Sequence, residues 1–195
     1  MKIKFFLLAG LSALLLTACS EESDTVEEYA DWQNKNEQYF ESAYQLHAYD
    51  LALMKYSLSD ASTAEHTDYI LVNVIHEGDY DAKTPYLTDT VQVHYVGHLI
   101  PSATYTTGYQ FDASYQEPFD YDTARPTKLA VNGLIPGFTT ALLKMHRGDH
   151  WMITIPYQLG YGTSTSSSGA VPAYSTLLFE IRLEDFWSKK QGDRE

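Results

Sequence analysis

The sequence predicts an α+β fold, in which an antiparallel sheet packs on one short α-helix. Three observations lead to this fold class. Four segments have the composition or the alternation of β-strands, one short segment between them has helical spacing, and a longer amphipathic segment precedes them all. Several antiparallel strands around few helices are typical of α+β domains.

The predicted strands all follow residue 68. Tyr69–Ile75 is rich in β-branched residues, and Thr90–Val96 alternates between its two faces. On Thr90–Val96, one face carries Val91, Val93 and Tyr95, and the other carries Gln92, His94 and Val96. Two further strands are predicted at residues 151–155 and 177–183.

Two helices are predicted. The shorter helix spans Gly137 to Met145, and the longer one runs from about Val26 to Met54, where apolar and aromatic residues recur at spacings of three and four. The aromatic stripe of the longer helix must pack against another surface. That surface is either the chain's own domain or a partner, which includes a second copy of the chain. Residues 57–68 predict a linker, and residues 163–168 predict a flexible loop tip.

The N-terminal segment has the features of a secretory signal. Two lysines precede an apolar run over residues 5–16, which is shorter than the roughly 20 residues that span a bilayer. Residues 16–19 resemble the lipobox of bacterial lipoproteins, in which the cysteine is acylated and becomes the new N-terminus. We therefore expect a signal peptide over residues 1–18 and a lipid on Cys19, an ordinary signal peptide being the alternative. Cys19 is the only cysteine, so no intramolecular disulfide can form.

We expect four regions along the chain. They are the signal peptide (1–18), an acidic spacer with the amphipathic helix and linker (19–68), the α+β domain (69–187) and a polar tail (188–195). The lipid would anchor the chain in the cell envelope. Ser20 is not the aspartate that commonly retains such proteins at the inner membrane, so the outer membrane is expected, on its periplasmic or its surface face.

Charge and motif content exclude several classes of function. The formal net charge is −13, and loss of Lys2 and Lys4 with the signal peptide makes it two units more negative, which argues against a nucleic-acid partner. His94 and His98 would lie about 13 Å apart on a strand, too far to share a metal ion. No nucleophile elbow and no glycine-rich phosphate loop occurs, so neither a hydrolase nor a nucleotide site is indicated. No cofactor and no metal is expected.

Four segments in order resemble the FKBP family of peptidyl-prolyl cis-trans isomerases, and a closing pair completes the series. They are Val91–Gly97, Gly108–Ser114, Leu134–Phe138 with Ala141–Met145, and Ile155–Gly162, followed by Val171–Pro172 and Leu177–Glu180. The resemblance covers roughly residues 70–187. It implies a twisted antiparallel sheet wrapped on a short helix, in agreement with the strands and helix predicted above.

The resemblance also implies a proline-binding pocket. Its catalytic residues would be Asp112, Tyr161 and Tyr95, and its substrate-binding residues Phe111, Leu134, Ile135, Phe138 and Phe179. Phe138 stands where the family usually has tryptophan. One further pocket aromatic of the family has no clear match, and the candidates for its place are Phe119, Tyr121, Thr127 and Leu129. Tyr95 and Phe179 could instead be plain core residues.

The implied activity is isomerisation of X-Pro peptide bonds in exported or unfolded proteins. An apolar slot would favour the twisted amide, which has lost resonance, over its planar forms. The alternative function is a non-catalytic chaperone or a proline- or peptide-binding module on the same fold. The amphipathic helix would add a binding surface or form a homodimer. A surface protein that binds other ligands through its 16 tyrosines is a third alternative.

Overall fold

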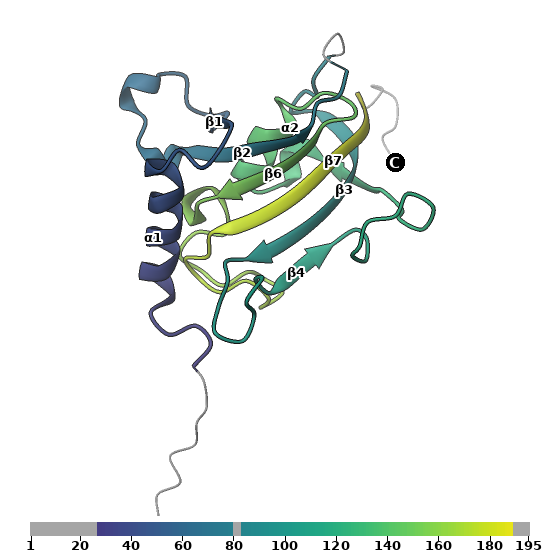
Figure 1. Cartoon of the computed structure of the whole chain (residues 1–195). Coiled ribbons are helices and arrows are strands. Elements are labelled where there is room, and N and C mark those ends of the chain that lie inside the picture. Colours follow the sequence, from purple (N-terminus) through teal and green to yellow (C-terminus); the bar gives the residue numbers. More distant parts are fainter. Residues whose placement is uncertain (1–26, 80–82, 189–195) are drawn as a thin grey trace, which may run out of the picture.

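The computed structural model describes residues 27–79 and 83–188. The predicted signal peptide and Cys19 lie outside the described residues, as does most of the predicted polar tail. Within the described part, one antiparallel sheet of seven strands has the order β1-β2-β6-β7-β3-β4, with β5 also paired to β3 (Figure 1). No helix of this part is long and apolar enough to cross a bilayer.

The described residues form α-helices, strands and single 3₁₀ turns. The helices are α1 (Trp32–Gln45) and α2 (Pro136–Leu142). The strands are β1 (Leu51–Met54), β2 (Tyr69–His76), β3 (Asp89–Leu99), β4 (Gln110–Ala113), β5 (Thr127–Ala130), β6 (His150–Ile155) and β7 (Leu177–Ser188). Single 3₁₀ turns are η1 (Ala61–Thr63), η2 (His66–Asp68), η3 (Val131–Gly133) and η4 (Tyr157–Leu159).

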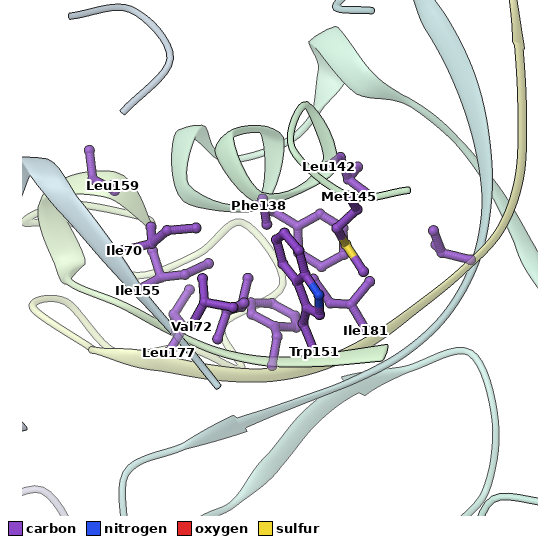
Figure 2. Close-up of a cluster of buried hydrophobic side chains, with 14 of the residues drawn as sticks. Ile70, Val72, Phe138, Leu142, Met145, Trp151, Ile155, Leu159, Leu177 and Ile181 are labelled. Atoms are coloured by element: carbon purple, nitrogen blue, oxygen red, sulfur yellow. The ribbon is translucent and has the colours of Figure 1, made fainter. Parts of the chain in front are cut away.

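The main hydrophobic core lies between α2 and one face of the sheet (Figure 2). Apolar side chains of β2, β6 and β7 meet Phe138, Leu142 and the following Met145 there, and all of them are at least 95% buried. β3 and β7 form the longest pairing, from Leu99–Leu177 to Asp89–Ser188. Because these two strands lie at the centre of the sheet, residues from both can reach a site beside α2.

The predicted α+β class and all four predicted strands are confirmed. The structure extends them by one to five residues, and it adds the short strands β1, β4 and β5. The shorter helix starts one residue earlier than predicted, at Pro136, whose fixed φ suits a first helical turn. It ends at Leu142, although Met145 still packs in the core from the turn that follows.

The longer helix was predicted too long. α1 ends at Gln45, and the chain then turns through His47, which has a left-handed backbone (φ 51°). Leu51–Met54 forms the strand β1 and pairs with β2, so the sheet includes residues before Tyr69. The apolar residues that recur over 26–54 thus belong to two elements, the helix α1 and the strand β1. Residues 51–54 form a strand because they pair with β2.

The stripe of α1 packs on the chain's own domain. Trp32, Asn36 and Phe40 are buried, and Trp32 belongs to the main core. The indole N–H of Trp32 donates to the Ser175 hydroxyl at 2.8 Å, and the main-chain N–H of Thr176 donates to Asn36 Oδ1 at 2.7 Å. Of the two covers that the sequence leaves open, the structure shows the intramolecular one for these side chains.

The segment predicted as a linker carries local structure. Residues 57–68 include η1 and η2, and the Lys55 ammonium donates to Asp68 Oδ1 at 2.6 Å across it. This contact and the hydrogen bond from Lys55 N–H to the Asp68 carbonyl close the segment into a loop next to β1 and β2.

Candidate functional site

A small cavity of about 240 Å³ opens between α2 and the central strands. Its lining comes from β3, β4, β5, the η3–α2 connection, the segment after η4, and β7. The lining residues are Tyr95, Asp112, Leu129, Gly133, Leu134, Ile135, Phe138, Tyr161 and Phe179. Segments far apart in the sequence therefore converge on one mostly apolar cavity with a single carboxylate.

Aromatic rings form the apolar base of the cavity. The ring centroids of Phe138 and Phe179 lie 5.0 Å apart at an interplanar angle of 85°. The ring of Tyr95 lies 5.9 Å from Phe138 and 6.3 Å from Phe179. Edge-to-face packing of this kind is favourable and holds the three rings in fixed positions. The cavity can therefore receive a compact apolar group without rearrangement of its base.

Asp112 is the polar group of the cavity. The Tyr95 hydroxyl donates a 2.9 Å hydrogen bond to Asp112 Oδ2, which fixes the carboxylate at the mouth of the cavity. Burial raises the pKa of Tyr95 well above its usual value, and the bond to Asp112 raises it further. Burial and the nearby charge of Asp112 also raise the pKa of Tyr161. Both hydroxyls are therefore protonated and can donate hydrogen bonds at neutral pH.

A glycine in β3 allows two phenylalanines to pack across the sheet. A Cβ added at Gly97 would lie 2.6 Å from Phe179 and 2.7 Å from Phe111. The Phe111 ring packs edge-on against Phe179, with centroids 5.4 Å apart. β4 pairs with β3 with an irregular register just after Gly97, and this places Phe111 beside the base of the cavity.

Seven of the eight pocket residues predicted from the sequence line the cavity. Phe111 is the exception: it packs behind Phe179, and its substrate contact stays a prediction. The structure adds Leu129, which was one of the candidates for the unmatched aromatic position, and Gly133, for which the sequence carried no signal. The catalytic and substrate-binding roles of all these residues stay predictions.

Phe119 and Tyr121, the aromatic candidates for that position, lie elsewhere. Phe119 lies 5.0 Å from His94 and 4.6 Å from Tyr121, measured between ring centroids. His94 follows Val93 and precedes Tyr95 on β3, so this second aromatic cluster lies on the opposite face of the sheet from the cavity. The Arg182 guanidinium stacks over Phe119 at 4.2 Å, which closes the cluster.

No metal site is indicated by the geometry. In the ranges 27–79 and 83–188, no three histidine, cysteine or acidic side chains are grouped so that they could hold a metal ion. The chemistry that the cavity offers is apolar enclosure, one carboxylate, hydroxyl donors and main-chain N–H groups.

Known proteins share this fold and parts of this sequence. The FkpA structure from Escherichia coli matches 83% of this chain and 63% of its own, with a TM-score of 0.59 and 25% identity. A peptidyl-prolyl cis-trans isomerase structure from Pseudomonas syringae matches 81% of this chain with a TM-score of 0.57 and 22% identity, which shows the shared fold.

Curated relatives match about half of the sequence. The FKBP-type 22 kDa peptidyl-prolyl cis-trans isomerase of Escherichia coli is 38% identical over 110 residues, which are 56% of this chain and 46% of that protein. The outer membrane protein MIP of Legionella longbeachae is 34% identical over 99 residues, 51% of this chain and 37% of that protein. The chain thus spans less than half the length of these relatives.

A family model covers the strands and the helix that form the cavity. The model described as FKBP-type peptidyl-prolyl cis-trans isomerase matches residues 81–184. This range contains β3 to β6, α2 and most of β7, and with them every residue that lines the cavity. The chain belongs to the FKBP-type peptidyl-prolyl cis-trans isomerase family.

Proposed function

We propose that this chain catalyses cis–trans isomerisation of X-Pro peptide bonds in the cavity beside α2. The observation that carries the proposal is the cavity itself: about 240 Å³, with a base of three aromatic rings and one carboxylate hydrogen-bonded to a tyrosine. This volume suits a proline ring with its flanking amide better than a larger organic ligand. Membership of the family supports the same activity.

The mechanism needs no covalent step. The barrier to rotation of the amide, about 18–20 kcal/mol, comes from resonance that is lost in the twisted state. The rings of Phe138 and Phe179 would hold the proline in a dry environment, where the less polar twisted amide is favoured over the planar forms. The twisted state therefore binds more tightly than either ground state.

Three polar groups would orient the substrate. The main-chain N–H of Ile135, at the start of α2, would donate to a substrate carbonyl, and the Tyr161 hydroxyl would donate to a second one. The Asp112 carboxylate would polarise the surroundings of the bound amide. The hydrogen bond from the Tyr95 hydroxyl would hold this carboxylate in position. The support for these roles is that all four residues line the same cavity.

Exchange spectroscopy on short X-Pro peptides tests the proposal. The chain from residue 20 onward should accelerate cis–trans exchange, and Asp112→Ala and Tyr161→Phe should each lower kcat/KM by about tenfold, the loss expected when one transition-state contact is removed. If the parent protein binds the peptides without accelerating exchange, the chain is a binding module. If both variants keep the parent rate, the assignment of the site is wrong.

A lipid anchor at Cys19 and a place in the cell envelope belong to the same proposal. The support is the lipobox-like segment over residues 16–19 and the name of one relative, an outer membrane protein. The substrates would then be exported or unfolded proteins that contain X-Pro bonds. Labelling of cells with radioactive palmitate should mark the parent protein and leave Cys19→Ser unmarked, and a labelled variant would contradict the anchor.

A homodimer through α1 would have to use the exposed side of that helix. Its buried side is covered by the chain's own core, whereas Tyr39 is 37% exposed and Leu46, at the end of the helix, is 78% exposed. Sedimentation of the parent and of Leu46→Lys tests this arrangement. A dimer that Leu46→Lys converts to a monomer supports it, and a parent that sediments as a monomer at high concentration contradicts it.

A further inference from the structure

The strand β4 ends the sheet on the side of the cavity. Within the described part of the chain, β4 pairs with β3 and with no other strand. The main-chain N–H of Ser114 donates to the Tyr95 carbonyl at 2.9 Å. Successive N–H groups of a strand point to opposite sides, so the N–H of Ala113 points away from β3. Such an edge can accept a further strand.

An open groove adjoins β4. It has a volume of about 600 Å³, well within the range of ligand sites. We call it the β4 groove, and its lining residues are Gln110, Ala113, Ser114, Tyr115, Gln116, Thr123, Ala124 and Arg125. Asp112 lines the isomerase cavity and the next residue, Ala113, lines the groove, so both hollows adjoin β4.

The groove offers hydrogen-bonding groups and one positive charge. No carboxylate lines it, although the whole chain has a formal net charge of −13. Nη1 of Arg125 donates to the carbonyls of Asp122 at 3.3 Å and Ala124 at 3.1 Å, and no ion pair of Arg125 occurs among the described residues. The guanidinium is thus held by main-chain oxygens and keeps donors for an anion.

We propose that the β4 groove binds the part of a client polypeptide that flanks the proline. This part lies extended along β4 as an added strand, and an acidic client side chain pairs with Arg125. The occupant follows from the position of the groove, which adjoins the same strand as the cavity, and from the free edge of β4, the usual feature of strand addition. Four residues of β4 span about 13 Å, so roughly four client residues occupy the groove. The inference rests on the proposed isomerase function.

Peptide length tests the proposal on the chain from residue 20 onward. A tetrapeptide with one X-Pro bond occupies only the cavity. A twelve-residue peptide has the same four-residue core and four further residues on each side of it. These flanking residues include glutamates and also reach the groove. We expect kcat/KM for the longer peptide to be about tenfold higher, as two or three added hydrogen bonds would give. Equal values for the two peptides would overturn the proposal.

Two changes should remove this advantage and leave the tetrapeptide rate unchanged. N-methylation of the flanking amides of the long peptide blocks strand pairing without altering the protein. Arg125→Glu removes the cation, and its matched control is Lys35→Glu, an equal charge change at an exposed position of α1. An advantage that survives both N-methylation and Arg125→Glu would overturn the proposal, as would an equal loss in Lys35→Glu.

Failure of the groove and failure of the isomerase function give different results. If the tetrapeptide is not accelerated, the proposed function is wrong whatever the longer peptide does. If it is accelerated and the long peptide has no advantage, only the groove proposal is wrong. If the parent self-associates in sedimentation without peptide and Arg125→Glu abolishes this, a second copy occupies the groove, and the proposal is wrong.

Discussion

The Asn36 side chain, in α1, accepts a 2.7 Å hydrogen bond from the main-chain N–H of Thr176, just before β7. Asn36 is fully buried, and its Nδ2 donates to the Trp32 carbonyl at 2.7 Å. The hydroxyl of Thr176 in turn donates to the main-chain oxygen of Asn36 at 3.2 Å. A polar residue on the buried side of α1 thus fixes the position of this helix against the start of β7.

Replacement of Asn36 should therefore loosen α1. Asn36→Ala leaves the N–H of Thr176 buried without its acceptor, which costs about 1–3 kcal/mol of the free energy of unfolding. Denaturant unfolding followed by circular dichroism measures this, and Asn34→Ala, at an exposed position of the same helix, should change the value by less than about 0.5 kcal/mol. Equal effects of the two changes would contradict the role given to Asn36.

Gly97→Ala should disturb the base of the cavity. The added Cβ would lie within 2.7 Å of Phe179 and Phe111, closer than real contacts, so one ring must move. We expect a loss of about 1–3 kcal/mol in stability and a lower kcat/KM. Gly133→Ala is the matched control for stability, because its Cβ would meet no atom within 4 Å. A Gly97→Ala protein with parental stability and rate would refute this packing argument.

Tyr95→Phe should separate positioning from packing. It removes the hydroxyl that holds Asp112 but keeps the ring that packs against Phe138. We expect stability to fall by no more than about 1.5 kcal/mol and kcat/KM by about tenfold, with the decrease mainly in kcat. A change confined to KM would show that the hydroxyl serves ground-state binding instead.

Stability should fall as the pH is lowered, because of His94. Burial lowers the pKa of this imidazole, the positive charge of Arg182 lowers it further, and its Nδ1 has no hydrogen-bond partner in the described structure. The Glu184 carboxylate lies 3.9 Å from Nε2 of the same ring. The folded state binds this proton more weakly than the unfolded state does. The free energy of unfolding is therefore at its full value above about pH 6.5 and decreases as the pH falls below that value.

A variant without the imidazole isolates this effect. His94→Phe fits the aromatic cluster and cannot be protonated, so its free energy of unfolding should fall less than that of the parent between pH 7.5 and 5. Burial also lowers the pKa of His150, which therefore contributes to the pH dependence of both proteins. Parallel stability curves for parent and variant would show that His94 does not titrate in this range.

Strand periodicity and the family motifs were sufficient to predict the centre of the molecule. The buried residues of β3 and β7 follow the two-residue period of strands with one buried face, as Val91 and Val93 do on β3 and Phe179 does on β7. Tertiary packing agrees with this local pattern. The helical spacing of Leu51 and Met54 was misleading, because four residues fit either period. Only the pairing of β1 with β2, a long-range contact, decides between the two structures.

The wall of the cavity next to β5 was less predictable. Phe119 and Tyr121 are the aromatic residues that precede β5 most closely in the sequence. They nevertheless pack on the other face of the sheet, where they contact the ring of His94 and where Arg182 stacks over Phe119. Leu129 lines the cavity because β5 pairs with β3 at Val91. Which face an irregular segment covers depends on partners that are distant in sequence, and local composition does not encode them.

The central pairing of β3 with β7 has a consequence for export. In the described part of the chain β7 is the last strand, and it lies between β6 and β3 and pairs with both. Without β7 the two halves of the sheet are not joined, and contacts of such large sequence separation form slowly. If residues 1–18 direct export, the sheet is therefore completed only after β7 has crossed the membrane, and the preceding part of the chain can cross in an unfolded state.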